Sequence, residues 1–337
     1  MLQLHYKKVR HAFEYPFTIS KGTKTHQEAL VIALGMGPYW GFGEACKINY
    51  YGIDLDAMIS LLESKKQVIQ KYALTDPERF WHFLHHLIPD QHFLIAALDC
   101  AGWDLFAKMR QKKVYQLIGV EQLHALSTNY TIGLAEPAEM LEKMKAHPWP
   151  IYKVKISNAN DIDTLALLRA HTKSLIRIDA NEALDVTTTL KLLPEFEKLA
   201  IELIEQPIAK DNYEGMQELK AKSSIPFYAD EACVTENDVI RCKNAFHGIT
   251  IKLSKCGGIT PALRMIKEAR GLGMSIMLGN MNECSIGTAA LVHLQHLVDK
   301  MDADGPLLLK EDSGKGLFYE HAIACVEDKN GLGIQAL

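Results

Sequence analysis

The sequence predicts an α/β protein in which a parallel (β/α)7–8 barrel of the TIM type follows a separate N-terminal α+β unit. From about residue 124 onward, short runs rich in β-branched residues alternate with stretches of helical periodicity. Before that point strand-like runs come first and helical stretches follow, which is typical of an α+β unit. The 337 residues also exceed the about 250 residues of a simple barrel and leave room for such a unit.

Within the first 120 residues the order is strands, then helices. Residues 2–6 alternate in polarity and residues 29–34 are entirely apolar, so both predict strands, and residues 41–45 begin a third element. The polar, glycine-containing stretch 19–25 predicts a loop. Helical spacing follows over residues 55–72, 77–87 and 92–112.

The barrel portion contains eight strand candidates, each separated from the next by a helical stretch. The strands are expected at residues 125–132, 151–157, 175–180, 200–205, 226–230, 248–253, 275–279 and, as a short one, near Asp302. The helices are expected at residues 137–146, 161–171, 187–196, 213–220, 236–244, 260–271 and 286–297. Residues after about 310 predict strands and turns that return to the N-terminal unit. The expected domains are therefore 1–120, 121–310 and 311–337.

Composition excludes several classes of protein. The net charge is -4 and no run of lysine and arginine marks a nucleic-acid face. No apolar stretch approaches the ~20 residues of a membrane span, and the alternating N-terminus lacks the apolar centre of a signal peptide. The seven cysteines are scattered without a CxxC pair, which predicts reduced thiols in a cytoplasmic protein.

Two lysines stand out on the second barrel strand. Lys153 and Lys155 are two residues apart, so their side chains project from the same face of the strand. If that face lines the barrel interior, the two like charges oppose each other and one lysine is pushed toward neutrality. A neutral lysine is a base. The alternative for a lone Lys-x-Lys is a solvated edge strand.

Carboxylates end the three strands that follow. Asp179, Glu205 and Asp230 lie about 25 residues apart, which is one βα unit each time, so they are expected side by side at the barrel mouth where such folds place their chemistry. Three adjacent carboxylates do not all stay ionised without a cation, and an oxygen-only ligand set favours Mg²⁺. Lys252 and Lys255 end the sixth strand and would flank the metal from the other side. Any one of these acids alone is more often a helix cap or a surface ion pair.

Five consecutive strand ends together carry a recognisable pattern. It reads Lys153-Val-Lys155, Asp179-Ala-Asn181, Glu205-Gln-Pro, Asp230-Glu231 and Ile-Lys252-Leu-Ser-Lys255-Cys-Gly-Gly-Ile. Over essentially its whole length, the chain resembles the muconate-lactonizing enzyme subgroup of the enolase superfamily. Within that subgroup it is most similar to the dipeptide epimerases, such as the L-Ala-D/L-Glu epimerases. That closer likeness rests on Met301-Asp302-Ala-Asp304-Gly-Pro, on Asn280-Met-Asn-Glu283 and on Asn129-Tyr-Thr131.

The resemblance implies a fold and an activity. The α+β unit would be a capping domain that the C-terminal segment completes, and the chain would form a homo-oligomer. The activity would be Mg²⁺-dependent epimerisation of a dipeptide, by transfer of a proton between two lysines at the α-carbon of the C-terminal residue through an enediolate. The superfamily pairs a lysine or histidine base with Mg²⁺ in this way.

The resemblance also implies residue roles. Asp179, Glu205 and Asp230 would bind the metal, Lys155 and Lys252 would be the acid/base pair, and Lys153 would support the enolate. The expected substrate contacts are Asp302 and Asp304, which would hold the α-ammonium, with Thr131, Lys255, Glu283 and Lys24. One departure is that Glu182-Ala-Leu follows Asn181, where many relatives carry glycine and an aromatic residue.

Several alternatives remain open from the sequence. The same site would serve an N-acylamino acid racemase, an o-succinylbenzoate synthase or a cycloisomerase, and a different class would be a non-catalytic ligand-binding barrel. The spacing of Asp302 and Asp304 also fits a solvated turn before Gly305-Pro306. Glu283 fits a capping group as well as a substrate contact. Lys21 or Lys24 would either attract an acidic substrate side chain or be solvated.

Overall fold

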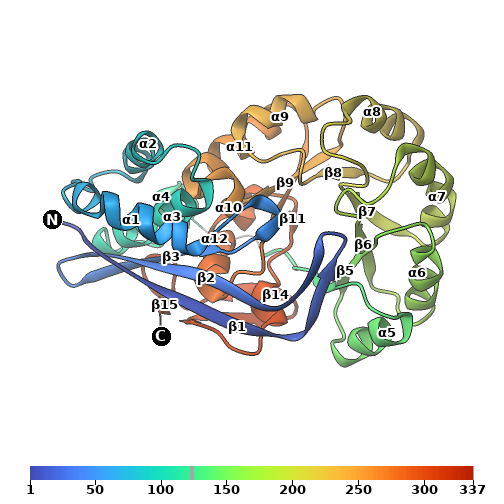
Figure 1. Ribbon diagram of the computed structural model, residues 1–337, viewed down its shortest axis with the longest axis horizontal. Helices are drawn as coiled ribbons and strands as arrows, with labels where there is room; N and C mark the ends of the chain where they lie inside the picture. The colour runs from blue at the N-terminus through green and yellow to red at the C-terminus, as the bar shows by residue number, and fades with distance from the viewer. Residues whose placement is uncertain (122–124, 337) are drawn as a thin grey trace.

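The computed structural model describes residues 1–121 and 125–336, and its dominant feature is a curled parallel sheet (Figure 1). Eight strands lie in chain order from β4 to β11. The two edges of the sheet meet, because Thr128, just before β4, forms a parallel bridge with Met301 of β11. The Ala303 amide also donates a hydrogen bond to Thr128 Oγ1 at 2.7 Å. The predicted parallel barrel is therefore confirmed.

The barrel strands are short and almost wholly buried, as expected for strands covered on both faces. They are β4 (Tyr130–Ile132), β5 (Ile151–Lys155), β6 (Leu175–Asp179), β7 (Ile201–Glu205), β8 (Phe227–Ala229), β9 (Gly248–Lys252), β10 (Ser275–Gly279) and β11 (Lys300–Met301). The helices that form the outer arc in Figure 1 are α5 (Pro137–Ala146), α6 (Asp161–Ala170), α7 (Val186–Lys198), α8 (Tyr213–Lys222), α9 (Glu236–Cys242) and α11 (Ile259–Gly271), with α12 (Ser285–Leu294) after them.

The eighth unit of the barrel is incomplete. Among the described residues no α-helix follows β11, and a 3-10 turn at Gly305–Leu308 (η3) stands in its place. The sequence -Asp304-Gly-Pro- explains this, since proline fits the start of a short turn and both residues disfavour a continuing helix. The fold is thus seven complete units and an eighth strand. A single extra turn, α10 (Leu253–Cys256), follows β9 directly.

The N-terminal unit consists of three antiparallel strands packed against helices. The strands are β1 (Gln3–Ile19), β2 (Gly22–Met36) and β3 (Tyr39–Cys46), and the helices are α1 (Leu55–Gln70), α2 (Pro77–Leu87), α3 (His92–Met109) and α4 (Val114–Leu117), with a 3-10 turn at Asn49–Tyr51. Strand β3 lies directly on α3, because a Cβ at Gly43 would be 2.0 Å from the Ala97 carbonyl oxygen. Glycine is needed there for the close approach of strand and helix.

The prediction of a loop at residues 19–25 is wrong. Strands β1 and β2 form one long hairpin, and only Ser20 and Lys21 make the turn between Ile19 and Gly22. The polar, glycine-containing stretch 19–25 suggested a loop, but a two-stranded ribbon that projects from the sheet has little apolar surface to cover. In Figure 1 this hairpin crosses in front of the barrel, and its tip reaches the strands β5 and β6.

The C-terminal segment contacts both parts of the chain. It contains β12 (Gly314–Lys315) paired with β15 (Gln335–Ala336), and β13 (Leu317–Glu320) paired with β14 (Ile323–Val326). The Lys310 amide donates to the Ala12 carbonyl at 2.8 Å, and the Val114 amide donates to the Gly331 carbonyl at 3.0 Å. On the barrel side, the Thr128 amide donates to the Ala322 carbonyl at 2.7 Å. The division at residues 120 and 310 stays a prediction.

The state of the cysteines and the length of the helices bear on the expectations of reduced thiols and of no membrane span. All seven cysteines are free thiols. No helix in residues 1–121 and 125–336 has the length and apolarity needed to cross a bilayer.

Buried carboxyl groups join the N-terminal unit to the barrel. The Glu44 carboxyl, on β3, accepts hydrogen bonds from the Cys284 amide at 3.1 Å and the Gly287 amide at 3.0 Å, at the start of α12. Asp99, on α3, accepts from the Thr260 amide at 2.9 Å, at the start of α11. Helix N-termini attract negative charge, yet burial is the larger effect here and raises the pKa of each carboxyl to about 7.

The Glu44 contact predicts how stability depends on pH. In the unfolded chain this carboxyl ionises near 4.5, whereas in the folded protein it stays protonated until about pH 7. The folded state therefore binds more protons between these values, and the free energy of unfolding contributed by Glu44 falls as pH rises, by about 3 kcal/mol across the window. Urea unfolding of wild type and Glu44→Gln at a series of pH values measures this difference.

The wild type is expected to lose stability relative to Glu44→Gln between about pH 4.5 and 7 and to lose no more above it. Asp211→Asn, at an exposed position, is the matched control and is expected to show no such trend. A difference between wild type and Glu44→Gln that does not change with pH would contradict the assignment.

Candidate active site

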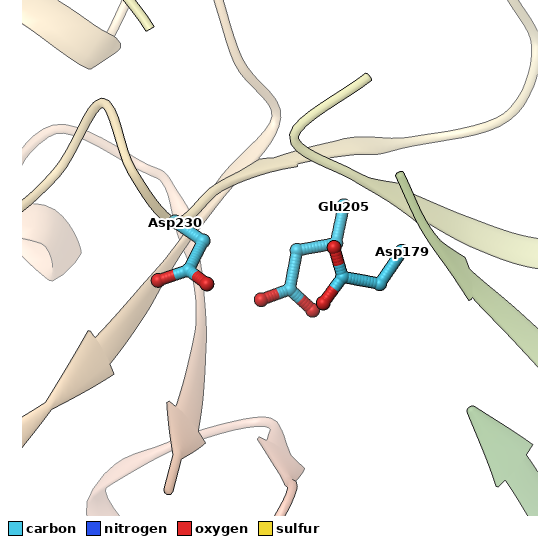
Figure 2. A group of neighbouring side chains, drawn as sticks. All are labelled: Asp179, Glu205 and Asp230. Atoms are coloured by element: carbon cyan, nitrogen blue, oxygen red, sulfur yellow. The ribbon is translucent and has the colours of Figure 1, made fainter. Parts of the chain in front are cut away.

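Three carboxylates lie together at the carboxyl ends of neighbouring strands (Figure 2). Asp179 ends β6 and Glu205 ends β7, and the register pairs them directly, while Asp230 follows β8. All three are buried, with exposed fractions of 0%, 0% and 2%. One oxygen from each lies within 4.8 Å of the others, so a single ion can contact all three. The sequence prediction that these residues lie side by side is therefore confirmed.

The carboxylate cluster fits a hard divalent cation. Both oxygens of Glu205 are buried without a hydrogen bond from the described residues, although Lys153 Nζ makes an ion-pair contact with Oε2 at 2.7 Å. Burial, together with the negative charges of Asp179 and Asp230, raises the pKa of Glu205 to about 7. The donor atoms are all oxygens, which suits Mg²⁺ better than a softer metal.

Backbone turns immediately after the strands hold the acids in place. Asn181 and Gln206 have φ values of 43° and 36°, in the left-handed region that L-residues rarely adopt. The Asn181 amide donates to Asp179 Oδ1 at 3.0 Å. Gln206 Oε1 accepts from the amides of Asp230 at 3.1 Å and Ala232 at 3.0 Å. Asn181 and Gln206 thus orient the carboxylate cluster, and the strained backbone conformation of both residues is typical of functional sites.

Lys155 and Lys252 approach the cluster from opposite sides. Lys155 ends β5, the second barrel strand, and Lys252 ends β9, the sixth, so the two stand across the mouth of an eight-stranded barrel. Lys155 Nζ lies 2.6 Å from Asp179 Oδ2, and Lys252 Nζ lies 2.8 Å from Asp230 Oδ2. Both line the same cavity.

Lys153 occupies the centre of the site, and its surroundings show that it is not the lysine pushed toward neutrality. Its ammonium lies 2.8 Å from Asp302, 2.7 Å from Glu205 and 3.1 Å from Asp179. Burial would lower the pKa of Lys153, but the surrounding carboxylates outweigh it and hold the pKa well above its usual value. The pKa of Lys252 is raised in the same way, mainly by Asp230 against the effect of burial. Lys153 and Lys155 both contact Asp179 Oδ2, so the two ammonium groups do face the same point, with a carboxylate between them.

Asp302 and Asp304 form an acidic pair opposite Glu205. They follow β11, the eighth strand, and are only 4% and 1% exposed, so the alternative of a solvated turn is wrong. Asn129 Nδ2 donates to both carboxylates, at 2.9 and 3.2 Å. Burial and the neighbouring Asp302 raise the pKa of Asp304 to about 7. Burial would raise the pKa of Asp302 as well, but Lys153 lowers it to about 2.

The N-terminal unit supplies one wall of the cavity, and no local sequence pattern predicted most of its residues. Phe17, Ile19, Ile48 and Tyr50 line the cavity together with Lys24. Phe17 and Lys24 are direct partners across the β1–β2 hairpin, so their side chains share a face. These residues can be recognised as lining the cavity only from the strand register and from the docking of the hairpin on the barrel.

The hairpin tip is fixed over the barrel mouth by polar contacts. Ser20 Oγ donates to the Asn181 carbonyl at 3.0 Å, and the Leu134 amide donates to the Thr18 carbonyl at 2.9 Å. Lys21 Nζ pairs with Glu182 at 2.8 Å on the exposed side of the hairpin, and Lys21 does not line the cavity. The departure from the family pattern at Glu182 thus has a structural role.

The remaining predicted substrate contacts divide into two pairs. Thr131 and Lys24 line the cavity, and Lys24 Nζ donates to Gln27 Oε1 at 3.0 Å. Lys255 and Glu283 do not line it. Lys255 Nζ lies behind Asp230 and donates to its carbonyl at 2.5 Å and to the Cys233 carbonyl at 3.0 Å.

Glu283 lies in the loop after β10. Its Oε1 accepts from Ser254 Oγ at 2.5 Å, and its Oε2 accepts from the Met281 amide at 2.5 Å. It therefore connects this loop, which lines the cavity, to Ser254 in the turn after β9. Neither of these contacts caps a helix, and the side chain does not line the cavity, so neither interpretation of Glu283 is confirmed.

Comparisons with known proteins agree with this geometry. The chain matches the family models "Mandelate racemase / muconate lactonizing enzyme, N-terminal domain" over residues 1–119 and "Enolase C-terminal domain-like" over residues 136–336. It is 39% identical over 324 residues to the L-Ala-D/L-amino acid epimerase of Flavobacterium johnsoniae, and the match covers 96% of each chain. It is 40% identical over 316 residues to the enzyme of the same name from a Maribacter species, with 94% of each chain covered.

Two solved structures share the whole fold. One is a substrate-liganded complex of the L-Ala-D/L-Glu epimerase from Bacillus subtilis, with a TM-score of 0.94, 25% identity, and coverage of 99% of this chain and 98% of that one. The other is a dipeptide epimerase from Cytophaga hutchinsonii complexed with Mg and D-Ala-L-Val, with a TM-score of 0.92, 25% identity, and coverage of 99% and 95%. With two family models that span nearly the whole sequence, the chain belongs to the mandelate racemase/muconate lactonizing enzyme family of the enolase superfamily.

Proposed function

We propose that this protein catalyses the Mg²⁺-dependent epimerisation of dipeptides at the α-carbon of the C-terminal residue. The observation that carries the proposal is the four-sided arrangement of the mouth. Metal-binding carboxylates on the third to fifth strands face the acidic pair after the eighth strand, and Lys155 and Lys252 stand on the two sides between them. A dipeptide has a carboxylate at one end and an ammonium at the other, so it suits a site with a cation at one edge and carboxylates at the opposite edge.

The names of the relatives support the same substrate class. The two curated relatives are L-Ala-D/L-amino acid epimerases, and the solved structures include dipeptide epimerases complexed with Mg and a dipeptide. The N-succinyl-L-Arg/Lys racemase of Bacillus cereus is also a relative, at 24% identity, so the family alone does not separate dipeptides from N-acyl amino acids. Asp302 and Asp304 favour the dipeptide, because an N-acyl group has no positive charge for them to pair with and an N-succinyl group adds a carboxylate that they would repel.

The two lysines exchange a proton with opposite faces of the α-carbon. One lysine takes the α-proton as the C–H bond breaks, and the electron pair moves onto the carboxylate as an enediolate. The other lysine, protonated, delivers a proton to the far face, which inverts the centre. Lys153 donates to the carboxylate oxygens, where the negative charge accumulates. When bound by Asp179, Glu205 and Asp230, Mg²⁺ supplies positive charge that stabilises the same oxygens.

Replacing Asp304, one of the acidic pair, is expected to weaken the binding of dipeptides. Asp304→Asn keeps the shape of the side chain but removes a charge that faces the α-ammonium. The expected result is a fall in kcat/KM for dipeptides of about tenfold to a hundredfold, expressed mainly in KM, since pairing of the ammonium contributes to binding before and during the reaction. Steady-state kinetics measure the change, and Asp299→Asn, outside the cavity, is the control.

Comparing dipeptides with N-acyl amino acids tests the proposal itself. Purified wild type is incubated with Mg²⁺ and two panels, L,L-dipeptides and N-succinyl-L-amino acids, and chiral chromatography detects inverted products. We expect more inversion in the dipeptide panel than in the N-succinyl panel. Inversion of the N-succinyl panel alone would replace the dipeptide proposal with an N-acylamino acid racemase. A homo-oligomeric state and a cytoplasmic location stay predictions.

A further inference from the structure

A second hollow adjoins the active-site cavity. We call it the aromatic pocket, because Phe13, Tyr15, Phe17 and Tyr130 form its walls, with Leu308 from the turn after β11. Its cavity volume is about 20 Å³, which is enough to hold a water molecule. The proposed reaction gives this pocket no role.

The Phe17 side chain forms a partition between the active-site cavity and the aromatic pocket. Together with Thr131 it lines both the active-site cavity and the aromatic pocket. Its ring stacks on Phe13, with centroids 5.4 Å apart and planes inclined by 17°. The strand pairing of β1 is interrupted between Ala12 and Phe17, and this irregularity turns the ring toward the barrel. The neighbouring Thr18 is held by the Leu134 amide.

The partition lies beside the end of the cavity that receives the first residue of a dipeptide. The α-ammonium is placed at Asp302 and Asp304, and the Thr131 hydroxyl hydrogen-bonds to Asp304. The side chain of the first residue branches from the carbon that carries this ammonium. It therefore begins at the end of the cavity where Thr131 and Phe17 line both the active-site cavity and the aromatic pocket.

We propose that Phe17 limits the first residue of the substrate to a small side chain, by closing the aromatic pocket off from the active-site cavity. This inference rests on the proposed dipeptide epimerase function and names the residue that sets its selectivity. Removing the ring joins the two spaces and provides a mainly aromatic-walled channel, with Lys143 against the Tyr15 ring, for a large first residue. Phe17 is a specificity-determining residue and takes no part in proton transfer.

The test compares first residues rather than overall rates. For wild type and Phe17→Ala, kcat/KM is measured for dipeptides that share the C-terminal residue and begin with L-Ala, L-Leu or L-Phe. Wild type is expected to prefer L-Ala. In Phe17→Ala the ratio of kcat/KM for L-Phe-first to L-Ala-first substrates is expected to rise by about tenfold or more, in line with what apolar pocket contacts contribute to discrimination.

Two further variants control for general damage to the hairpin. Ile19→Ala removes apolar atoms from the same face of the same strand, but Ile19 lines only the active-site cavity. It is expected to leave the ratio within about twofold of wild type. Phe17→Leu keeps apolar packing against Phe13 and opens the partition only in part, so an intermediate ratio is expected. It also serves if Phe17→Ala does not fold.

The outcomes separate this inference from the proposed function. A wild type that epimerises L-Ala-first dipeptides, with an unchanged ratio in Phe17→Ala and Phe17→Leu, overturns the role of Phe17 and leaves the function standing. An equal rise in Ile19→Ala overturns it too, because general loosening of the hairpin then accounts for the change. Wild type without epimerisation of any dipeptide overturns the proposed function instead.

Discussion

Epimerisation is expected to disappear when either Lys155 or Lys252 is replaced by alanine, while the fold survives. Each lysine stands on its own side of the mouth, so neither can perform the other's proton transfer. General acid–base groups of this kind contribute about 10²–10⁴-fold to the rate, and inversion needs both. Steady-state kinetics on each variant measure the loss, and circular dichroism verifies the fold.

The two variants are further expected to differ in isotope exchange. In D₂O the lysine that remains can still remove and return a proton on its own face. Each variant should therefore exchange the α-proton of one epimer without inverting it, and the two variants should exchange opposite epimers. Lys145→Ala, at an exposed position on α5, is the control and should behave as wild type. Retained epimerisation in Lys155→Ala would overturn the assignment of the base.

Replacing Glu205 by glutamine is expected to remove most of the Mg²⁺ affinity and with it the activity. The carboxylate oxygens of Glu205 are buried and accept no hydrogen bond from the described residues. Lys153 Nζ lies 2.7 Å from Oε2, and a divalent cation is the further partner that these oxygens can take. An amide supplies one oxygen without charge, and the affinity should fall about 10–100-fold or more, measured by titration calorimetry. Excess Mg²⁺ should restore only part of the rate.

The metal-free Glu205→Gln variant is expected to be at least as stable as metal-free wild type, although its Mg²⁺ affinity is lower. In the metal-free protein the Glu205 carboxylate is desolvated beside two other acids, and its removal relieves that repulsion. Glu205→Gln is thus expected to unfold at an equal or higher urea concentration than metal-free wild type. Glu202→Gln, on the same strand but paired with Arg177 and Lys300, is the matched control and should keep its Mg²⁺ affinity. Unchanged affinity in Glu205→Gln would remove it from the metal site.

The sequence predicted the barrel far better than the hairpin that covers it, for a physical reason. Buried parallel strands are short apolar runs bounded by turn residues, and helix α5 and strand β10 begin and end at the predicted residues. The β1–β2 hairpin instead projects over the barrel mouth, and its polar, glycine-containing stretch 19–25 resembles a loop. Strand order also explains why the sequence predicted the cluster of Asp179, Glu205 and Asp230. Each residue lies at the carboxyl end of a strand, and consecutive strands are separated by one βα unit.

Other parts of the site depend on contacts that no local pattern encodes. Phe17 and Tyr50 reach the cavity only because the N-terminal unit docks on the barrel, through contacts such as that of Glu44 with α12. The protonation of Lys153 could not be predicted from its spacing to Lys155, for a related reason. Their carboxylate partners come from other strands, and those charges decide the protonation of Lys153.

The central claim is tested most directly by α-deuterium incorporation into a dipeptide. Wild type is incubated in D₂O with an L-Ala-first L,L-dipeptide, with Mg²⁺ or with a chelator, and proton NMR follows the α-proton of each residue. With Mg²⁺, deuterium is predicted at the C-terminal α-carbon alone, together with appearance of the L,D epimer, and the chelator should stop both. Absence of Mg²⁺-dependent exchange across a full panel of dipeptides would contradict the account.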